Sequence, residues 1–354
     1  LLAYVIDPFL LAKDESPSRA HTHHVESLLM AQVFLDLGYD VDIIDYRNKG
    51  FRPKKEYRLF LSARTYFANL ADRLNDDCVC IAHLDTAHFL FNNSAAFARL
   101  QALKERRAIA TASMKLIESN WAPERADALT VLGNAFTLGT YAYAKKPMYA
   151  LPVPTPESYP SPADKDFEAV RNRFIWLGSH GFAHKGLDLV LESFAAMPHL
   201  HLSVCGPIED RKERHFREAY HHELYELPNI DTVGWVDVGS PQFARLVRHS
   251  LGLVYPSASE GQAGAVATCL RAGLVPVVSY ESGTDIGNAG HILQSSTVEH
   301  IRATLNQLSE QPSEVLREMA MEAWNRGETH HSQESYKRLF RQAVTAILER
   351  AEGR

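Results

Sequence analysis

The chain has 354 residues, of which 45% are hydrophobic and 23% charged, a composition typical of a folded protein of about two domains. Its formal net charge of −6 disfavours a general nucleic-acid-binding surface, because such a surface needs a strong basic excess. No apolar run reaches the ~20 residues of a membrane span and no signal-peptide pattern is present, so we expect a cytoplasmic protein.

Short apolar strands and amphipathic helices alternate along the first half of the chain, as in parallel α/β sheets. In the first predicted helix Val25, Leu29 and Val33 lie near a 3.6-residue spacing, and Gly38 ends the pattern. The predicted strands are 2–7, 41–44 and 78–82, the predicted helices are 24–38 and 95–106, and shorter candidates lie at 108–112 and 128–132.

A proline-rich segment at 151–164 separates the two halves, since five of its fourteen residues are proline. Such a density excludes a helix or a central strand, so we place a linker there. The predicted domains are 1–155 and 156–330, followed by a C-terminal helix within 331–354 that packs back on the first domain.

Beyond the linker the predicted strands are continuous apolar runs, as expected when helices cover both faces of a sheet. This pattern indicates a doubly wound, Rossmann-like sheet, whose ligands bind beyond the carboxyl ends of the strands. The predicted strands are 174–177, 200–205, 230–233, 251–255 and 275–279, and the predicted helices are 187–196, 242–249, 263–272, one from Arg211 and a docked tail helix at 333–349.

The first loop that could bind a ligand is Gly178-Ser-His-Gly-Phe-Ala-His-Lys-Gly186, between a strand and a helix. Backbone N–H groups at the start of that helix, together with Lys185, suit a diphosphate. The spacing differs from a P-loop, because Lys185 precedes its glycine. The structural alternative is a glycine turn with Lys185 in solvent.

The second loop is Tyr255-Pro-Ser-Ala-Ser-Glu-Gly-Gln-Ala-Gly264, which also follows a strand and leads into a helix. A carboxylate at a strand end can accept hydrogen bonds from sugar hydroxyls, and the nearby glycine N–H groups can face phosphate. The structural alternative is a capping box, because Ser257-x-x-Glu260 also fits that pattern.

Four segments occur in a characteristic order: FIWLGSHGFAHKGLDLVLESFA at 174–195, LSVCGP at 202–207, VGW at 233–235 and YPSASEGQAGAVATCLRAGLVPVVSYESGTDI at 255–286. This series resembles the C-terminal domain of the retaining GT-B-fold glycosyltransferases (glycosyl transferases group 1) that carry an E-x7-E signature. The likeness covers residues 174–325, and in the first half it rests on the βαβ start and His83. It implies an α/β GT-B fold, with two Rossmann-like domains facing across a cleft and a C-terminal helix crossing back.

The resemblance implies that Lys185 faces the diphosphate of a nucleotide sugar and that Glu260 holds sugar hydroxyls. It places His83 across the cleft near the sugar, with Asp85 and His88 as nearby alternatives. The donor is a substrate, so no separate cofactor is expected. The donor-binding positions that it marks are Gly178, Ser179, Gly206, Gly234, Trp235, Val236, Gly261, Gln262, Ala263, Gly264 and Thr268, with 234–236 bordering the base.

Three departures from the family pattern concern the donor site. Thr268 stands where the second Glu of E-x7-E usually grips the ribose, and its hydroxyl makes fewer hydrogen bonds. Ser179 stands where the family has an Arg, so one cation remains where two usually meet the diphosphate. The family's N-terminal Gly-Gly turn has no match between residues 7 and 24. The sequence offers three arginines as replacement charges: Arg19, Arg245 and Arg248.

A metal site is not expected. His21, His23, His24 and Glu26 lack a defined ligand spacing, and the four cysteines match no zinc pattern. We interpret the histidines as solvated or acceptor-side groups. GT-B-type transferases generally work without a bound metal.

A basic run spans residues 47–64 and is followed by a mixed apolar stretch, 57–67. It could meet anionic lipid at the inner membrane face or a phosphorylated acceptor. The alternative is a solvated helix face.

The resemblance implies a retaining, metal-independent hexosyltransferase of polysaccharide biosynthesis that moves a sugar from a nucleotide-diphosphate sugar to a glycan, a lipid-linked or a small-molecule acceptor. The alternative is a non-catalytic or partner-dependent GT-B module that binds glycan or another transferase. Thr268 and Ser179 motivate that alternative, because both usual donor-binding side chains are replaced.

Overall fold

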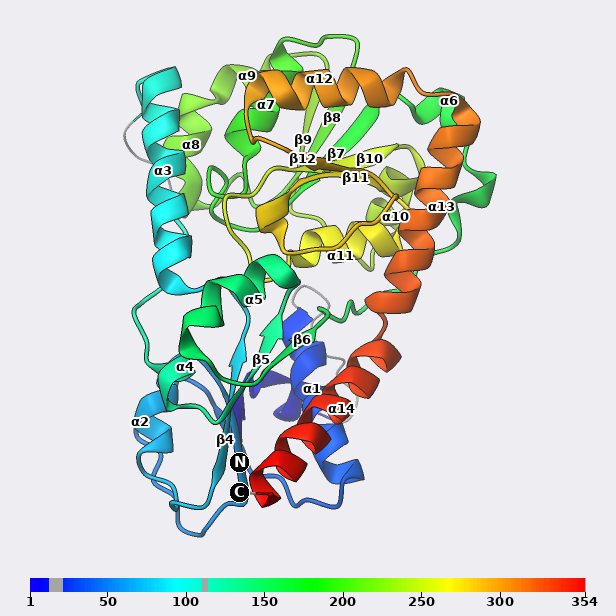
Figure 1. Ribbon diagram of the computed structural model, residues 1–354. Coiled ribbons are helices and arrows are strands. Elements are labelled where there is room, and N and C mark those ends of the chain that lie inside the picture. Colours follow the sequence, from blue (N-terminus) through cyan, green and yellow to red (C-terminus); the bar gives the residue numbers. More distant parts are fainter. Residues whose placement is uncertain (13–21, 110–113, 354) are drawn as a thin grey trace.

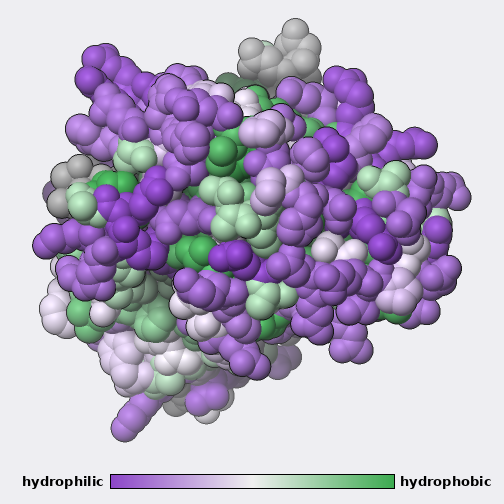
Figure 2. Space-filling view, turned by 90° about the horizontal axis from the view of Figure 1, so that it is seen from above, coloured by the Kyte–Doolittle hydropathy of each residue, from purple (hydrophilic) through white to green (hydrophobic). Residues whose placement is uncertain are grey.

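The computed structural model describes residues 1–12, 22–109 and 114–353. Its chain forms two parallel sheets, one from each half of the sequence, stacked with their carboxyl ends facing each other (Figure 1). Among the described residues, no helix combines the length and apolar character needed to cross a bilayer. Seen from above Figure 1, on the side of the C-terminal sheet, the surface is mainly hydrophilic with scattered hydrophobic residues (Figure 2).

The N-terminal sheet has the strand order β2-β1-β3-β4-β5-β6, and every neighbouring pair is parallel. Its central strands are buried along their whole length, which explains their unbroken apolar sequence. The strands are β1 (Leu2–Tyr4), β2 (Ile43–Asp45), β3 (Leu59–Ala63), β4 (Val79–Leu84), β5 (Ala128–Leu132) and β6 (Met148–Leu151); the helices are α1 (Thr22–Asp36), α2 (Phe67–Ala71), α3 (Phe89–Arg107), α4 (Ala122–Arg125) and α5 (Ala135–Tyr141).

The C-terminal sheet has the order β12-β11-β10-β7-β8-β9 and is also parallel. The strands are β7 (Arg173–Leu177), β8 (His201–Cys205), β9 (Ile230–Gly234), β10 (Gly252–Tyr255), β11 (Val275–Ser279) and β12 (His291–Leu293). The helices are α6 (Phe167–Val170), α7 (Leu187–Ala195), α8 (Arg214–Ala219), α9 (His221–Tyr225), α10 (Pro241–Arg248), α11 (Gly264–Arg271), α12 (Val298–Ser309) and α13 (Ser313–His330).

The last helix, α14 (Gln333–Glu352), returns to the N-terminal sheet and packs against α1. Tyr336 and Phe340 are fully buried there, and the rings of Phe34 and Phe340 meet edge to face at 5.5 Å. The predicted docking of the tail helix is therefore confirmed.

Helix α3 also crosses between the two halves, which its sequence did not indicate. It begins after β4 in the N-terminal sheet, but Leu103 near its end is fully buried in the hydrophobic core of the C-terminal half. Figure 1 shows α3 running from the N-terminal domain up beside α8 and α9. The helix is also longer than the predicted 95–106.

The helix interpretation of the basic run was wrong. Residues 47–58 form no helix, and the stretch that follows contains β3, a fully buried strand between β1 and β4. The charges lie in the preceding loop, where Arg47 pairs with Asp45, Lys55 with Asp42 and Arg58 with Glu352. The five-residue strand was obscured because basic residues flank it on both sides.

Other boundaries differ by a few residues, and several elements had no predicted counterpart. The predicted strand at 2–7 is shorter, ending at Tyr4, and the strand at 41–44 begins at Ile43. The candidate at 108–112 is irregular at 108–109, and the rest of it lies outside the described residues. Besides β3, the elements without a predicted counterpart include the strands β6 and β12, the short helices α2, α4, α5 and α6, and the helices α12 and α13.

Candidate donor site between the two sheets

The two loops singled out in the sequence converge on one carboxylate. Lys185 Nζ lies 3.7 Å from Glu260 Oε1 and donates to the Tyr255 hydroxyl at 3.2 Å, which in turn donates to Glu260 Oε1 at 3.0 Å. Lys185 is 8% exposed and Glu260 is 5% exposed. The alternative of a lysine in solvent is therefore wrong.

The capping-box alternative for Ser257 and Glu260 is also wrong. Helix α11 begins at Gly264 with Ala263 at its N-cap and has no side-chain cap. The Ser257 hydroxyl instead donates to Glu260 Oε1 at 3.3 Å, and the Glu260 N–H donates to the carbonyl oxygen of Glu281. The Ser257 side chain therefore holds the Glu260 carboxylate in place, and neither side chain caps the helix.

The ionisation of the cluster follows from burial and neighbouring charge. Burial alone would raise the pKa of Glu260, but Lys115 and then Lys185 outweigh it and hold that pKa well below its usual value. Burial lowers the pKa of Lys185, and the charge of Glu260 opposes the shift. Burial also lowers the pKa of His184 to about 4, so its imidazole is neutral at pH 7.

Local geometry fixes the two loops against each other. Gly186 has φ +77°, and a Cβ there would lie 2.5 Å from the carbonyl oxygen of Pro256. The N–H of Ala258 donates to the carbonyl oxygen of His184, whose Nε2 lies 2.7 Å from the carbonyl oxygen of Ser259. The loops therefore form one rigid unit beyond the carboxyl ends of β7 and β10.

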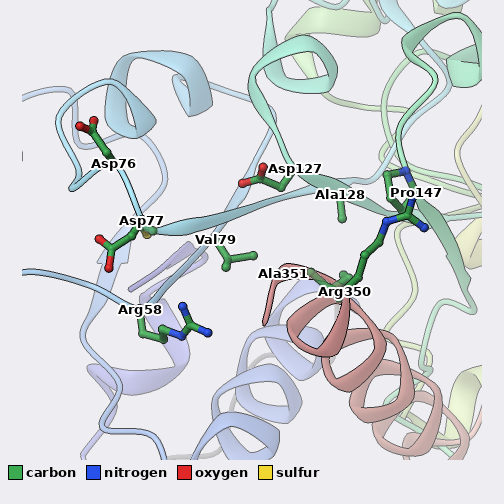
Figure 3. Close-up of a pocket in the computed structure, with 11 residues that line it drawn as sticks. Arg58, Asp76, Asp77, Val79, Asp127, Ala128, Pro147, Arg350 and Ala351 are labelled. Atoms are coloured by element: carbon green, nitrogen blue, oxygen red, sulfur yellow. The ribbon is translucent and has the colours of Figure 1, made fainter. Parts of the chain in front are cut away.

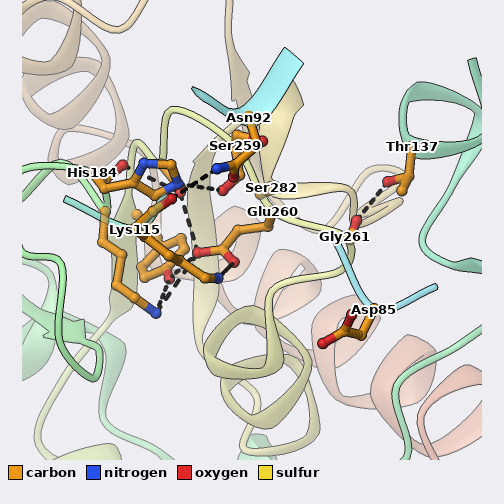
Figure 4. Close-up of polar contacts among 12 residues, drawn as sticks. Asp85, Asn92, Lys115, Thr137, His184, Ser259, Glu260, Gly261 and Ser282 are labelled. Atoms are coloured by element: carbon orange, nitrogen blue, oxygen red, sulfur yellow. Dashed lines mark hydrogen bonds and ion pairs between the residues drawn. The ribbon is translucent and has the colours of Figure 1, made fainter. Parts of the chain in front are cut away.

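A second cation, Lys115, completes the cluster and was missed in the sequence. Its Nζ donates to Glu260 Oε2 at 2.7 Å, although it belongs to the N-terminal half of the chain (Figure 4). The Asn92 side chain in α3 fixes this segment by donating to the carbonyl oxygen of Lys115 at 2.7 Å. No local sequence signal marks Lys115, because its partner lies 145 residues away.

The carboxyl ends of the two sheets touch at Gly261. A Cβ on Gly261 would lie 2.4 Å from the carbonyl oxygen of Asp85, which follows β4. The hydroxyl of Thr137 in α5 donates to the carbonyl oxygen of Gly261 at 2.5 Å (Figure 4). The two domains that face each other therefore touch at this point.

His83 lies in a buried polar network of the N-terminal domain. Its Nδ1 is 2.9 Å from Thr130 Oγ1, and its Nε2 is 3.8 Å from Glu26 Oε2. Tyr4 donates to Glu26 at 2.7 Å. The two nearby alternatives to His83 have other partners: Asp85 pairs with Arg64, and His88 caps α3.

The remaining predicted donor positions fall into three environments. Gly178 and Gly206 pack on the indole of Trp176, since a Cβ on either would lie within about 3 Å of it. Ser179 and Trp235 are exposed, Trp235 at 58%, beside Gly234 (φ +83°) and the buried Val236. At the start of α11, Gln262 accepts from the Val153 N–H at 2.5 Å, Ala263 and Thr268 are buried, and Gly264 is half-buried.

Two of the arginines suggested as replacement charges do not join this cluster. Arg245 and Arg248 are exposed on α10, and Arg19 and His21 lie outside the described residues. Within the described residues, no group of three His, Cys, Asp or Glu side chains is arranged to hold a metal ion. His23 instead lies 2.8 Å from the Tyr4 hydroxyl and 3.1 Å from Glu26.

One well-formed pocket lies elsewhere. It is lined by Arg58, Asp77, Val79, Asp127 and Arg350, among others (Figure 3). Val79 begins β4, so this pocket is at the amino ends of the strands, opposite to the edge that carries Lys185 and Glu260. We therefore do not assign it to the donor site.

Comparisons with known proteins bear on the family and the fold. A model of the family described as "Glycosyl transferases group 1" matches residues 171–311, less than half of the chain. No curated protein matches the sequence.

Among solved structures, sucrose-phosphate synthase from Thermosynechococcus elongatus is similar with a TM-score of 0.58 and 14% identity, over 94% of this chain and 81% of that one. Anabaena HepE in complex with UDP and glucose gives a TM-score of 0.57 and 12% identity, over 82% and 78%. A mutant of S. aureus TarM in complex with Fondaparinux, alpha-GlcNAc-glycerol and UDP gives 0.55 and 13%, over 80% of this chain. This chain spans only 55% of the TarM chain. These likenesses confirm the expected GT-B glycosyltransferase fold.

Proposed function

We propose that this protein is a retaining glycosyltransferase that uses a nucleotide-diphosphate sugar as donor. The observation that carries the proposal is the convergence of Lys185 and Glu260 beyond the carboxyl ends of β7 and β10. A cation and an ionised carboxylate side by side provide one partner for a phosphate and one for sugar hydroxyls. The match of residues 171–311 to glycosyl transferases group 1 supports the same assignment.

In the proposed reaction, the acceptor oxygen attacks the anomeric carbon from the face on which the diphosphate leaves. The bond between that carbon and the phosphate oxygen breaks, the new glycosidic bond forms, and the acceptor proton passes to the leaving phosphate. Lys185 stabilises the negative charge that develops on the diphosphate. The first turn of α11, whose N–H groups have no partner within the helix, offers a second source of positive potential.

The charge of Lys185 is well suited to this role because the lysine is buried. A buried ammonium interacts more strongly with a phosphate than a solvated one, since water screens it less. Tyr255 and Glu260 hold its position before the donor binds. The site therefore requires little reorganisation when charge develops.

For the acceptor, we propose the cavity of about 460 Å³ at the carboxyl ends of β2 and β3. Tyr46, Arg64 and the segment 116–121 line it, and Arg64 pairs with Asp85, which contacts Gly261. A neighbouring cavity lined by Leu90, Trp121 and other largely apolar groups supports an acceptor with an apolar portion. Trp121→Ala should then reduce transfer to such an acceptor without changing nucleotide affinity.

The decisive experiment is a panel of UDP-, GDP- and ADP-sugars, assayed by calorimetric binding and by nucleotide release. We expect one base to bind, and we expect Lys185→Met to weaken that binding by about 10- to 100-fold, the equivalent of about 1.5–3 kcal/mol for a charged hydrogen bond. Glu260→Gln should lower turnover with a smaller effect on the affinity for the nucleotide alone. Glu299→Gln, an exposed change on α12, is the matched control.

The second candidate, a non-catalytic GT-B module, is favoured by the exposed Ser179 and by Thr268, a short hydroxyl at its position in α11. If wild type binds none of the donors at millimolar concentration, the transferase proposal is overturned. If a donor binds without turnover, the non-catalytic candidate replaces it. Thr268→Glu then tests whether a carboxylate at that position increases the affinity for nucleotide.

A further inference from the structure

We propose that Lys115, contributed by the N-terminal half of the chain, is the second cation of the donor diphosphate site. This inference rests on the proposed function, because it names a further residue of the same site. The proposal accounts for a missing cation, because Ser179 stands where a second positive charge would otherwise be expected.

Lys115 is held in this place by two sets of contacts. Its backbone is fixed by Asn92, and the next segment is fixed by Asn93, whose amide donates to the carbonyl oxygen of Ile117 and accepts from its N–H at 2.9 Å each. Its Cβ lies 3.6 Å from the position that a Cβ on Gly181 would take. The lysine therefore lies directly against the loop that carries Lys185.

The end of helix α3, the helix that carries Asn92, is attached to the C-terminal half. Arg106 of α3 pairs with Asp188 at 2.6 Å, and Arg107 pairs with Glu223 at 2.6 Å. With Leu103 buried in the C-terminal core, the end of α3 is tied to the domain that holds Lys185 and Glu260. Because Asn92 lies in the same continuous helix, we infer that Lys115 stays near the site even if the two sheets move apart.

In this structure, Glu260 pairs with two lysines, Lys115 at 2.7 Å and Lys185 at 3.7 Å. A sugar that binds Glu260 through its hydroxyls competes with Lys115 for Oε2. The side chain of Lys115 is 36% exposed, so it can move, but losing its carboxylate partner without a replacement would be unfavourable. The diphosphate attached to that same sugar is the replacement anion.

The opposite role is that of a plug, in which Lys115 occupies the sugar position and must be expelled. The two roles predict opposite changes in nucleotide affinity when the charge of Lys115 is removed. If Lys115 binds the diphosphate, removing its charge weakens nucleoside diphosphate binding; if it is a plug, removal strengthens it. The effect of Lys185→Met on nucleotide affinity is the reference for comparison, because Lys185 faces the same anion in the proposed function.

The test measures calorimetric affinity for UDP, GDP and ADP, for the matching nucleoside monophosphate and for inorganic pyrophosphate. For Lys115→Met we expect about a tenfold loss for the best-bound nucleoside diphosphate and for pyrophosphate, with little change for the monophosphate. Lys115→Arg should recover part of the loss, because it keeps the charge. Lys54→Met, in an exposed loop, is the control, and thermal unfolding checks that each variant is folded.

Unchanged or tighter diphosphate binding by Lys115→Met overturns this inference, as does an equal loss for the monophosphate. If Lys185→Met weakens binding while Lys115→Met does not, only the role of Lys115 fails and the proposed function stands. If wild type binds no nucleoside diphosphate, the proposed function fails and this inference fails with it.

Discussion

The guanidinium of Arg99, in helix α3, donates to the carbonyl oxygen of Pro256 at 2.9 Å. The same side chain donates to the carbonyl oxygen of Ala183 at 3.3 Å, so it joins the loop of Lys185 to the loop of Glu260. Arg99 is 9% exposed, and Asp188 lies 3.7 Å from it. A buried arginine with two carbonyl partners is a positioning residue for the whole donor site.

The first prediction concerns Arg99→Met. The change leaves two buried carbonyl groups without their partner, so we expect the free energy of unfolding to fall by about 2–4 kcal/mol. Because both site loops lose a shared contact, we also expect weaker nucleotide binding. Urea unfolding and calorimetry measure the two effects.

Arg125→Met is the control for Arg99→Met, because Arg125 forms an exposed pair with Asp72 and should change stability by less than about 1 kcal/mol. Equal effects of the two changes would contradict the role assigned to Arg99. Arg99→Lys keeps the charge but loses the fork of donors, and should restore only part of the stability.

The second prediction concerns the contact between the sheets at Gly261. A methyl group there meets the backbone of Asp85 at 2.4 Å, so Gly261→Ala should force the two carboxyl ends apart and destabilise the closed arrangement by about 1–3 kcal/mol. Small-angle scattering should show a larger radius of gyration. Gly139→Ala is the control because nothing lies within 4 Å of its Cβ, and in a helix it should be neutral or stabilising. A normal radius of gyration with full stability for Gly261→Ala would refute the contact.

The third prediction is a pH dependence of stability. The pKa of His184 falls from its ordinary 6.5 to about 4 on folding, chiefly because of burial, so the unfolded state binds more protons between these values. His184 therefore contributes stability above pH 6.5 that is lost as the pH falls toward 4, in total about 3 kcal/mol. His184→Gln should flatten that part of a urea-unfolding pH series, with His215→Gln, which is exposed, as control. Parallel pH curves for wild type and His184→Gln would show that His184 is not buried in the neutral form.

The fourth prediction compares two buried tyrosines near Glu26. Tyr4 donates to Glu26 at 2.7 Å, whereas the Tyr336 hydroxyl has no hydrogen-bond partner among the described residues. Tyr4→Phe should lower the free energy of unfolding by about 1.5–3 kcal/mol, and Tyr336→Phe should leave it unchanged or raise it by about 1 kcal/mol. Urea unfolding at pH 7 tests the pair, and the reverse order of stabilities would show that the network around Glu26 is arranged differently.

The sequence by itself determined the two parallel sheets and the placement of Lys185 and Glu260 at one edge of the second sheet. Both follow from short-range information, because unbroken apolar runs mark buried strands and because loops after parallel strands meet at one edge of the sheet. The tail helix was predictable for a similar reason, since its apolar face required a partner.

Only the tertiary structure decided which other groups reach the site. Lys115 and Arg99 meet their partners across 145 and 157 residues, and nothing in their own segments marks them. The path of α3 into the C-terminal core, the buried strand β3 and the contact of Asp85 with Gly261 depend on how the two halves pack. Such contacts arise from the relative position of whole elements, which local patterns of hydrophobicity and charge do not encode.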